Sequence, residues 1–76
     1  MVPVYAPSNE IEGQRIVRFL ISERVAAMLE VSSPLPQPLK WHTLRILAPE
    51  KQRPKAIELI ATARLDQVIA DNGMFL

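Results

Sequence analysis

Apolar residues recur along the chain with two different periods, and these predict three strands and two helices. Residues 2–6 form a short strand candidate, and residues 25–32 place apolar side chains on one face by a period of two. Residues 41–48 also alternate, with apolar side chains on both faces, which is typical of a central strand. After Asn9, and again after Pro54, the apolar residues recur with the period of a helix, so a helix is predicted at each place. The predicted order is therefore β-α-β-β-α.

This order predicts an α+β fold. Two helices of this kind can cover one face of a three-stranded sheet. A right-handed crossover from the first strand to the second leaves room for the third strand between them. Pro3 removes a ladder donor from the first strand, so we expect that strand at an edge of the sheet. The result is a ferredoxin-like unit that lacks its last strand, with both helices on one face.

The stretch at residues 8–16, "SNEIEGQRI", combines a capping residue, two acids and a glycine. A phosphate loop would need a glycine-rich turn, which is missing, and Glu10 and Glu12 point to different sides of a helix. Asn9 and Glu12 stand in the capping-box relation, in which Asn accepts from the N3 amide and Glu reaches back. Gly13 lies at the centre of the apolar arc, so we expect the helix to approach the sheet closely there.

The apolar stripe of the second helix changes face near Arg64 if the helix continues unbroken. "DNG" at residues 71–73 predicts a C-terminal stop and leaves an apolar tail. Two explanations stay open: a break that folds the last turns onto the same core, or a second apolar face offered to a partner. The candidate partner-binding residues are Leu65, Val68, Ile69, Met74, Phe75 and Leu76.

A chain of 76 residues makes one domain, residues 1–76, in which 65–76 is a candidate C-terminal interaction segment. Hydrophobic residues make up 49% of the chain but aromatic residues only 5%, so the core must be aliphatic and thin. The absence of cysteine excludes disulfides and thiolate metal sites. A single histidine argues against structural zinc. Oligomerisation is the stabilising device that remains.

Charge and hydropathy restrict the partners. A net charge of +1 does not favour a polyanion, and the strands offer only Tyr5 and Trp41 for stacking on bases, so nucleic acid is disfavoured. The longest apolar run, Val25 to Leu29, has five residues, whereas a membrane span needs about 20. The N-terminus does not resemble a secretory signal. We therefore expect a cytoplasmic protein, intact from its first methionine, without a membrane partner.

Candidate chemistry is sparse, and we predict no catalytic residue, no metal and no cofactor. His42 is a lone histidine with no recognisable nucleophile motif near it. Lys51, Arg53 and Lys55 place three positive charges at the start of the second helix, where they could hold an anion together with free helix amides. No glycine-rich loop precedes them, which favours a solvated turn. A sensor of a small ligand or anion is therefore the alternative function.

Two sets of residues have a spacing that is more specific than composition. The first set is Asn9, Glu12, Gly13, Ile16 and Leu20, followed by Val25 and Ala27, and the second is Leu44, Ile46 and Pro49, followed by Ala56 and Ile60. The first set resembles the N-x-x-E-A-x-x-L-x-x-x-L pattern, followed by G-I-x-A, of a small bacterial domain family described as prokaryotic signal-transducing proteins. The second set resembles that family's V-x-V-P strand end and the A-x-x-x-L of its second helix. Arg24 replaces the family's usual helix-closing glycine, Gly13 replaces its alanine, and residues 65–76 have no counterpart.

The resemblance implies a ferredoxin-like fold of the GlnB-like group and a regulatory or interaction role. Our leading hypothesis is a non-enzymatic protein-interaction or regulatory module related to signal transduction. We expect it to act as a homodimer or as a small subunit of a larger complex.

Overall fold

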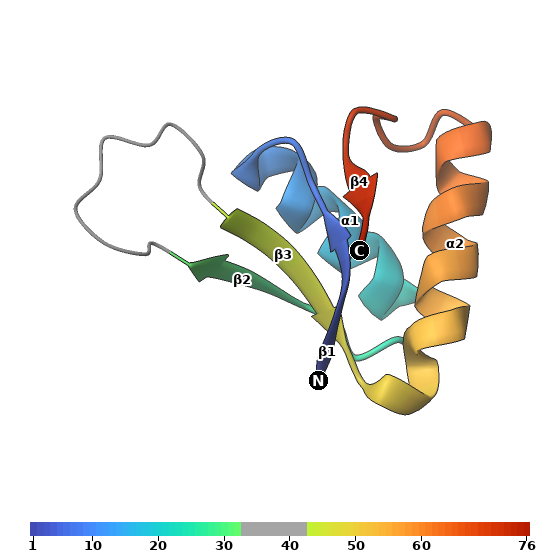
Figure 1. The fold of residues 1–76 in the computed structure, drawn as a ribbon. Coiled ribbons are helices and arrows are strands. Elements are labelled where there is room, and N and C mark those ends of the chain that lie inside the picture. The colour runs from blue at the N-terminus through green and yellow to red at the C-terminus, as the bar shows by residue number, and fades with distance from the viewer. Residues whose placement is uncertain (33–42) are drawn as a thin grey trace.

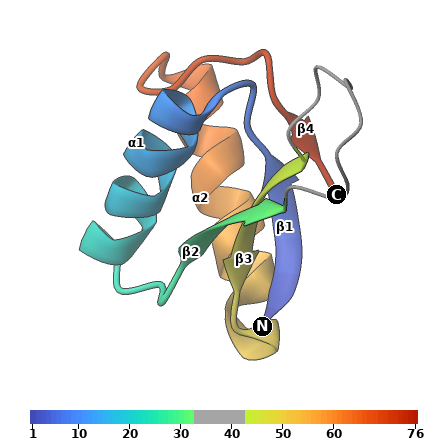
Figure 2. The ribbon, with the colours of Figure 1, turned by 90° about the vertical axis from the view of Figure 1, so that its left-hand side faces the viewer.

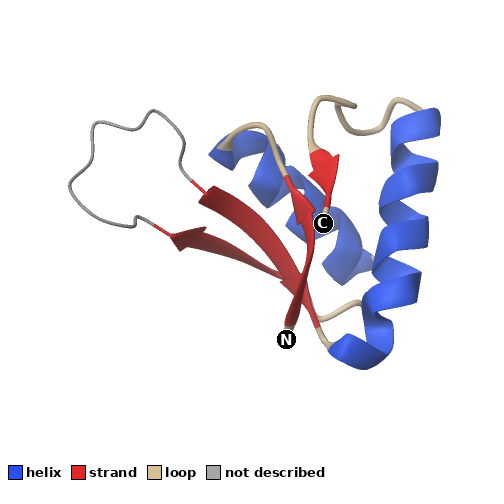
Figure 3. Ribbon diagram, viewed as in Figure 1, coloured by secondary structure: helices blue, strands red, loops and turns tan. Residues whose placement is uncertain are grey.

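The computed structural model describes residues 1–32 and 43–76. Its elements follow the order β1 (Val2–Ala6), α1 (Glu10–Ser22), β2 (Met28–Ser32), β3 (Thr43–Ala48), the short 3-10 helix η1 (Glu50–Gln52), α2 (Arg53–Leu65) and β4 (Met74–Phe75). The strands form one antiparallel sheet in the order β2-β3-β1-β4 (Figures 1 and 3). The predicted α+β class is confirmed.

The sheet has four strands, so the prediction of a three-stranded sheet without a last strand is wrong. The additional strand is β4, which pairs with β1 through Phe75 opposite Tyr5 and Met74 opposite Ala6. Sequence periodicity did not reveal it, because two residues are too few to establish a period of two. The C-terminal residues thus belong to the sheet instead of forming a free tail.

The first strand lies inside the sheet, between β3 and β4, and not at the edge that Pro3 had suggested. β4 pairs only with Tyr5 and Ala6, so no strand of the described chain lies on the outer side of β1 at Pro3. The register with β3 shifts between Pro3 and Tyr5. Such a bulge re-aims side chains, and both Val4 and Tyr5 are fully buried in the core although they are neighbours.

Both helices lie on one face of the sheet: in Figure 2, α2 passes behind the strands and α1 lies beside it, to the left of the strands. The core between the two layers is largely aliphatic, and its largest fully buried side chains are Tyr5, Ile16, Leu20, Ile46, Ile60, Val4 and Val25. Within residues 1–32 and 43–76, no helix lies on the opposite face of the sheet. This part of the chain therefore leaves that face uncovered and places β2 and β4 at the two edges of the sheet.

Gly13 lies where α1 crosses the sheet. A Cβ atom at this position would meet Leu29 Cδ1 of β2 at 2.9 Å and Pro7 Cγ at 3.0 Å. The missing side chain thus allows the close approach that the sequence predicted.

Each helix ends in the same hydrogen-bonded motif with a left-handed residue that is not glycine. Arg24, with φ of 66°, follows α1, and Gln67, with φ of 59°, follows α2. After α2, the Val68 N–H donates to Ala63 O at 2.9 Å and the Gln67 N–H donates to Arg64 O at 3.2 Å, which is the Schellman arrangement. The change of apolar face near Arg64 therefore marks the end of the helix at Leu65.

Two further boundaries differ from the prediction. β2 begins at Met28, three residues after the predicted start, because residues 25–27 complete the turn that leaves α1. The proline-rich connector after β2, together with Trp41 and His42, lies outside the described residues.

Candidate interaction surface

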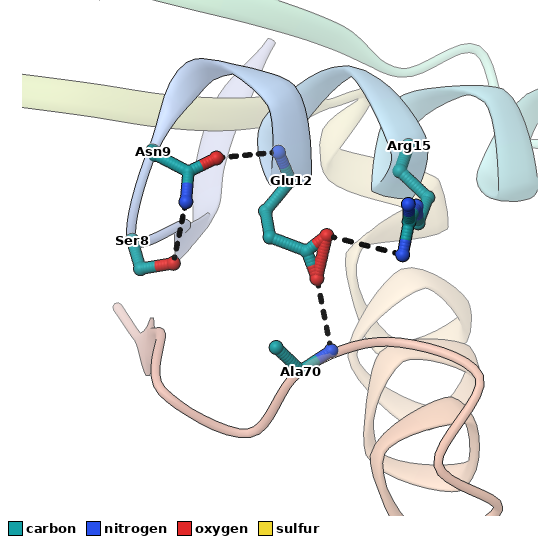
Figure 4. Close-up of polar contacts among 5 residues, drawn as sticks. All are labelled: Ser8, Asn9, Glu12, Arg15 and Ala70. Carbon is teal, nitrogen blue, oxygen red and sulfur yellow. Dashed lines mark hydrogen bonds and ion pairs between the residues drawn. The ribbon is translucent and has the colours of Figure 1, made fainter.

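The cap of α1 holds the C-terminal segment. The Asn9 side-chain oxygen accepts the Glu12 N–H at 2.8 Å, as predicted, and the Asn9 amide donates to Ser8 Oγ at 3.4 Å (Figure 4). The Glu12 carboxylate does not make the predicted return contact: it accepts the Ala70 N–H at 3.0 Å and lies 3.6 Å from the Arg15 guanidinium. Glu12 therefore joins the start of α1 to the residues that lead into β4.

The acidic residues of this cap have a structural role in the described chain. Glu10 is exposed and lies in the first turn of α1, where a carboxylate complements the helix dipole. Residues 1–32 and 43–76 contain no group of three or more histidine, aspartate or glutamate side chains that could hold a metal ion.

The segment after α2 both folds onto the core and exposes apolar side chains. Ile69 is only 4% exposed and belongs to the core cluster. Leu65 and Val68 point outward, with 84% and 53% of their surface exposed. Both explanations left open by the sequence therefore describe part of this segment. Ile69 is not accessible to a partner, and we leave it out of the candidate surface.

The candidate residues of β4 lie at the edge of the sheet. Met74 is 68% exposed and Leu76 is 48% exposed. The Phe75 ring packs edge-to-face on the buried Tyr5 ring, with centroids 5.1 Å apart. Even so, 37% of Phe75 stays exposed.

Arg64 connects the end of α2 to β4. Its guanidinium carbon lies 5.4 Å from the centre of the Phe75 ring and 6.0 Å from that of Tyr5, within the range of cation–π attraction. The same guanidinium donates to Asp71 O at 3.0 Å. A shallow groove beside these contacts is lined by Ala61, Arg64, Leu65, Asp71 and Phe75. A second depression joins it at Leu65 and extends past Val68 to Glu12 and Arg15.

Gly73 and Tyr5 determine how closely β4 approaches the core. A Cβ atom on Gly73 would lie 2.4 Å from the Tyr5 hydroxyl oxygen and 2.5 Å from the ring. The hydroxyl is buried, and no residue of the described chain accepts or donates a hydrogen bond to it. The sequence indicates Gly73 as part of a helix stop and not as the point of contact with Tyr5, and it gives no signal for Ala61 or Arg64 as groove residues. Only the end of the helix at Leu65 and the pairing of β4 bring them together.

The three basic candidates for anion binding lie at the start of α2 and just before it. Lys51, Arg53 and Lys55 are all exposed. The Arg53 guanidinium donates to Leu76 O at 3.4 Å, which directs it toward the end of β4. The Gln52 side chain is not available to an anion, because its amide donates to Arg24 O and its oxygen accepts the Ala26 N–H. Lys51 and Lys55 make no hydrogen bond or ion pair within residues 1–32 and 43–76.

Comparisons with protein-family models, with curated proteins and with solved structures found no match to this chain. The resemblance to signal-transducing proteins therefore stays a prediction from the sequence. No helix in the described part of the chain combines the length and the apolar character that crossing a membrane requires.

Proposed function

We propose that the protein is a non-enzymatic interaction or regulatory module that acts through its C-terminal surface, defined as Leu65, Val68, Met74, Phe75 and Leu76. One observation carries the proposal: the exposed Leu65 and Phe75 line one groove, Val68 lines the depression that joins it, and the exposed Met74 and Leu76 flank Phe75 in the chain. Single exposed apolar residues are normal on a protein surface. A connected group around a groove is typical of a contact with another macromolecule.

The arrangement of the elements supports a regulatory role more loosely. The order β-α-β-β-α-β with strands arranged β2-β3-β1-β4 fits a ferredoxin-like fold. The resemblance to signal-transducing proteins of the GlnB-like group points in the same direction, although one fold serves many functions. We infer that the module works as a homodimer or as a small subunit of a larger complex.

A site-specific photo-crosslinker tests this proposal. A benzophenone amino acid is placed at Leu65, which is 84% exposed, in cells that produce the protein naturally. The matched control carries the crosslinker at Ile21, which is 55% exposed and lies at the other end of the helical layer. We expect a discrete crosslinked product only from position 65. Its mass then distinguishes a second copy from a different protein, and equal products from both positions contradict the proposal.

Deletion of the C-terminal segment is a poor test, because it also removes a core residue and a strand. A chain ending at Arg64 would lack Ile69, which is buried, and β4, which pairs with β1. Loss of binding by that variant would not separate a lost contact surface from a lost fold. The substitution Leu65→Glu changes a side chain that contributes little to the core, and it is the better variant.

The alternative, a small-ligand or anion sensor at Lys51, Arg53 and Lys55, has less support. It depends on a helix N-terminus, and the guanidinium of Arg53 contacts Leu76. A phosphate-dependent thermal shift that disappears when the three charges are neutralised would favour it over the interaction module.

A further inference from the structure

The outer side of β4 offers the backbone groups of one particular residue. The Leu76 N–H donates inward to Val4 O at 3.2 Å. In an antiparallel ladder, successive residues direct their N–H and C=O groups to opposite sides of the strand. The N–H and C=O of Phe75 therefore point away from β1, toward the open edge of the sheet. These groups suit a partner that is itself an extended strand.

This edge strand is short but carries no charged side chain and no proline, two other features that keep sheet edges apart. Charged side chains, prolines and inward-pointing charges protect exposed edges in many proteins. Residues 73–76, "GMFL", contain no charge and no proline. β4 is short, which limits pairing, but Met74 and Leu76 on either side of Phe75 are both largely exposed.

We propose that a second copy of this chain pairs with this edge, β4 antiparallel to β4, around a two-fold axis at Phe75. The inference rests on the proposed function and identifies the partner of the same surface. In this arrangement the two Phe75 residues face each other and exchange both N–H···O bonds, as a hydrogen-bonded antiparallel pair does. The inward orientation of the Leu76 N–H fixes the register, because pairing shifted by one residue would meet groups already used by β1.

The charges at the two ends of the edge favour a second copy in this orientation. Arg53 lies at the Leu76 end, where its guanidinium donates to the Leu76 backbone. Asp71 lies at the other end, is exposed and lines the groove. An antiparallel arrangement reverses the second strand, so the Arg53 end of β4 in each copy meets the Asp71 end of β4 in the other. The two ends of the edge are thus opposite in charge across the axis, while Arg64 of each copy stays over its own Phe75 ring.

The groove beside β4 supplies the apolar contact that so short a strand needs. Two backbone hydrogen bonds alone contribute little net free energy in water. Arg64, whose guanidinium lies over the Phe75 ring, and Asp71 form the polar part of the groove's lining, and Ala61, Leu65 and Phe75 form the apolar part. Two-fold pairing brings the α2 helices of both copies to the same side of one continuous sheet, where these side chains cover each other. Aromatic residues that face each other across strands stabilise such pairs further.

Backbone methylation provides the sharpest test. The protein is prepared by chemical ligation with N-methylphenylalanine at position 75, which removes the outward N–H and keeps the Phe side chain. Sedimentation equilibrium should show a dimer for the unmodified protein and a dimerisation constant at least about tenfold weaker for the methylated one, since two hydrogen bonds are lost per dimer. Circular dichroism should show the same fold for both.

A charge exchange tests the orientation of the strands. Arg53→Asp and Asp71→Arg should each weaken the dimer, because like charges then meet across the axis. The double variant should restore it, because each copy again offers opposite charges to the other. A purely structural role of the Arg53 contact with Leu76 would not be rescued in this way.

The outcomes separate this inference from the proposed function. A protein that stays monomeric up to millimolar concentration overturns the inference, and so does a dimer that methylation at Phe75 leaves unchanged. If Leu65→Glu abolishes a dimer that methylation leaves unchanged, the C-terminal surface is still the contact and only the strand pairing is wrong. A crosslink from position 65 to a different protein supports the proposed function and overturns the second copy as the partner.

Discussion

The two edges of the sheet are built differently although the chain reaches them in the same way. Each edge strand follows a helix that ends at a left-handed residue other than glycine, Arg24 before β2 and Gln67 before β4. β2 is five residues long and carries Glu30, which forms an ion pair with Arg45 of β3. β4 is two residues long and uncharged.

The difference concerns where each edge places its apolar side chains. Arg45 lies between the buried residues Leu44 and Ile46, so its ion pair with Glu30 is on the sheet face without helices. That pair makes β2 a poor template for another strand. At β4 the apolar Phe75 borders a groove that Arg64 and Asp71 also line, and the Arg64 guanidinium lies over the Phe75 ring. The comparison supports the proposal that β4, and not β2, is the edge that pairs with a partner.

The largest expected effect comes from Gly73→Ala, which disturbs the β4 edge alone. The new methyl group would overlap the ring and hydroxyl of Tyr5, which is fully buried and cannot move aside. We expect a loss of about 1–3 kcal/mol in the free energy of unfolding, as for other overpacked sites. Urea denaturation measures the loss, and hydrogen exchange should show faster exchange at Leu76, whose N–H bonds Val4.

Gly13→Ala is the matched control on the β2 side. Its methyl group would meet Cγ of the buried Pro7 at 3.0 Å and the flexible end of Leu29 at 2.9 Å, but Leu29 is only partly buried and can rotate. Alanine also improves helix propensity by about 1 kcal/mol, which offsets the crowding. If Gly13→Ala destabilises the protein as much as Gly73→Ala, the two edges do not differ in how tightly they are fixed to the core.

The second prediction concerns the hydroxyl under β4. Tyr5→Phe removes a buried polar group that lacks a hydrogen-bond partner in the described chain, and it leaves the ring and its contact with Phe75 in place. An unsatisfied buried group costs on the order of 1–3 kcal/mol. We therefore expect the free energy of unfolding of the variant to rise by at least about 1 kcal/mol, which urea denaturation detects as a higher midpoint.

A double-mutant cycle sharpens this prediction. The hydroxyl oxygen is the atom nearest to the position of a Cβ on Gly73. Gly73→Ala should therefore cost less in the Tyr5→Phe background than in the natural chain. Additive effects would mean that the ring, and not the hydroxyl, sets the distance between β4 and the core.

A third prediction compares the two helix ends. Glycine adopts the left-handed conformation without the steric cost that other residues meet there, which is about 1 kcal/mol. Gln67→Gly and Arg24→Gly should therefore each stabilise the fold by about 0.5–1 kcal/mol in thermal or urea unfolding. Gln67→Ala and Arg24→Ala are the controls, since they shorten the side chain without relieving the backbone. A stabilisation by alanine equal to that by glycine would contradict the explanation.

The features that the sequence predicted are those with a local signal. Asn9 accepts from Glu12, and Gly13 lies at the crossing of α1 with the sheet, because capping and helical periodicity depend on neighbours in sequence. The β4 edge depends on long-range contacts. Neither the pairing of Phe75 with Tyr5 nor the bond from Ala70 to Glu12 has a periodic signal in the chain.

The same distinction explains the candidate site. Leu65 and Val68 could be singled out because an apolar stripe changed face, and the structure exposes both. Ile69 carried the same signal but lies in the core, since the left-handed Gln67 turns the chain there. A glutamine gives no sequence signal for that conformation, whereas a glycine would have.

The smallest expected effect on stability concerns the ion pair of the β2 edge. Glu30→Gln removes the charge that pairs with Arg45, and both side chains are more than a third exposed. We expect the free energy of unfolding to fall by at most about 1 kcal/mol, and by less at high salt, as for other exposed pairs. Glu58→Gln, at an exposed position of α2, is the control for the loss of one charge.

The informative readout for this edge is association, not stability. If the charge at Glu30 keeps β2 from pairing, Glu30→Val should promote concentration-dependent self-association. N-methylation at Phe75 should not suppress this association, because the new contact forms at the opposite edge of the sheet. Light scattering on Glu30→Val with and without that methyl group measures the two contacts separately. Association that is unchanged by Glu30→Val would mean that the ion pair does not protect β2, and the length of the edge strands would then be the only difference left between them.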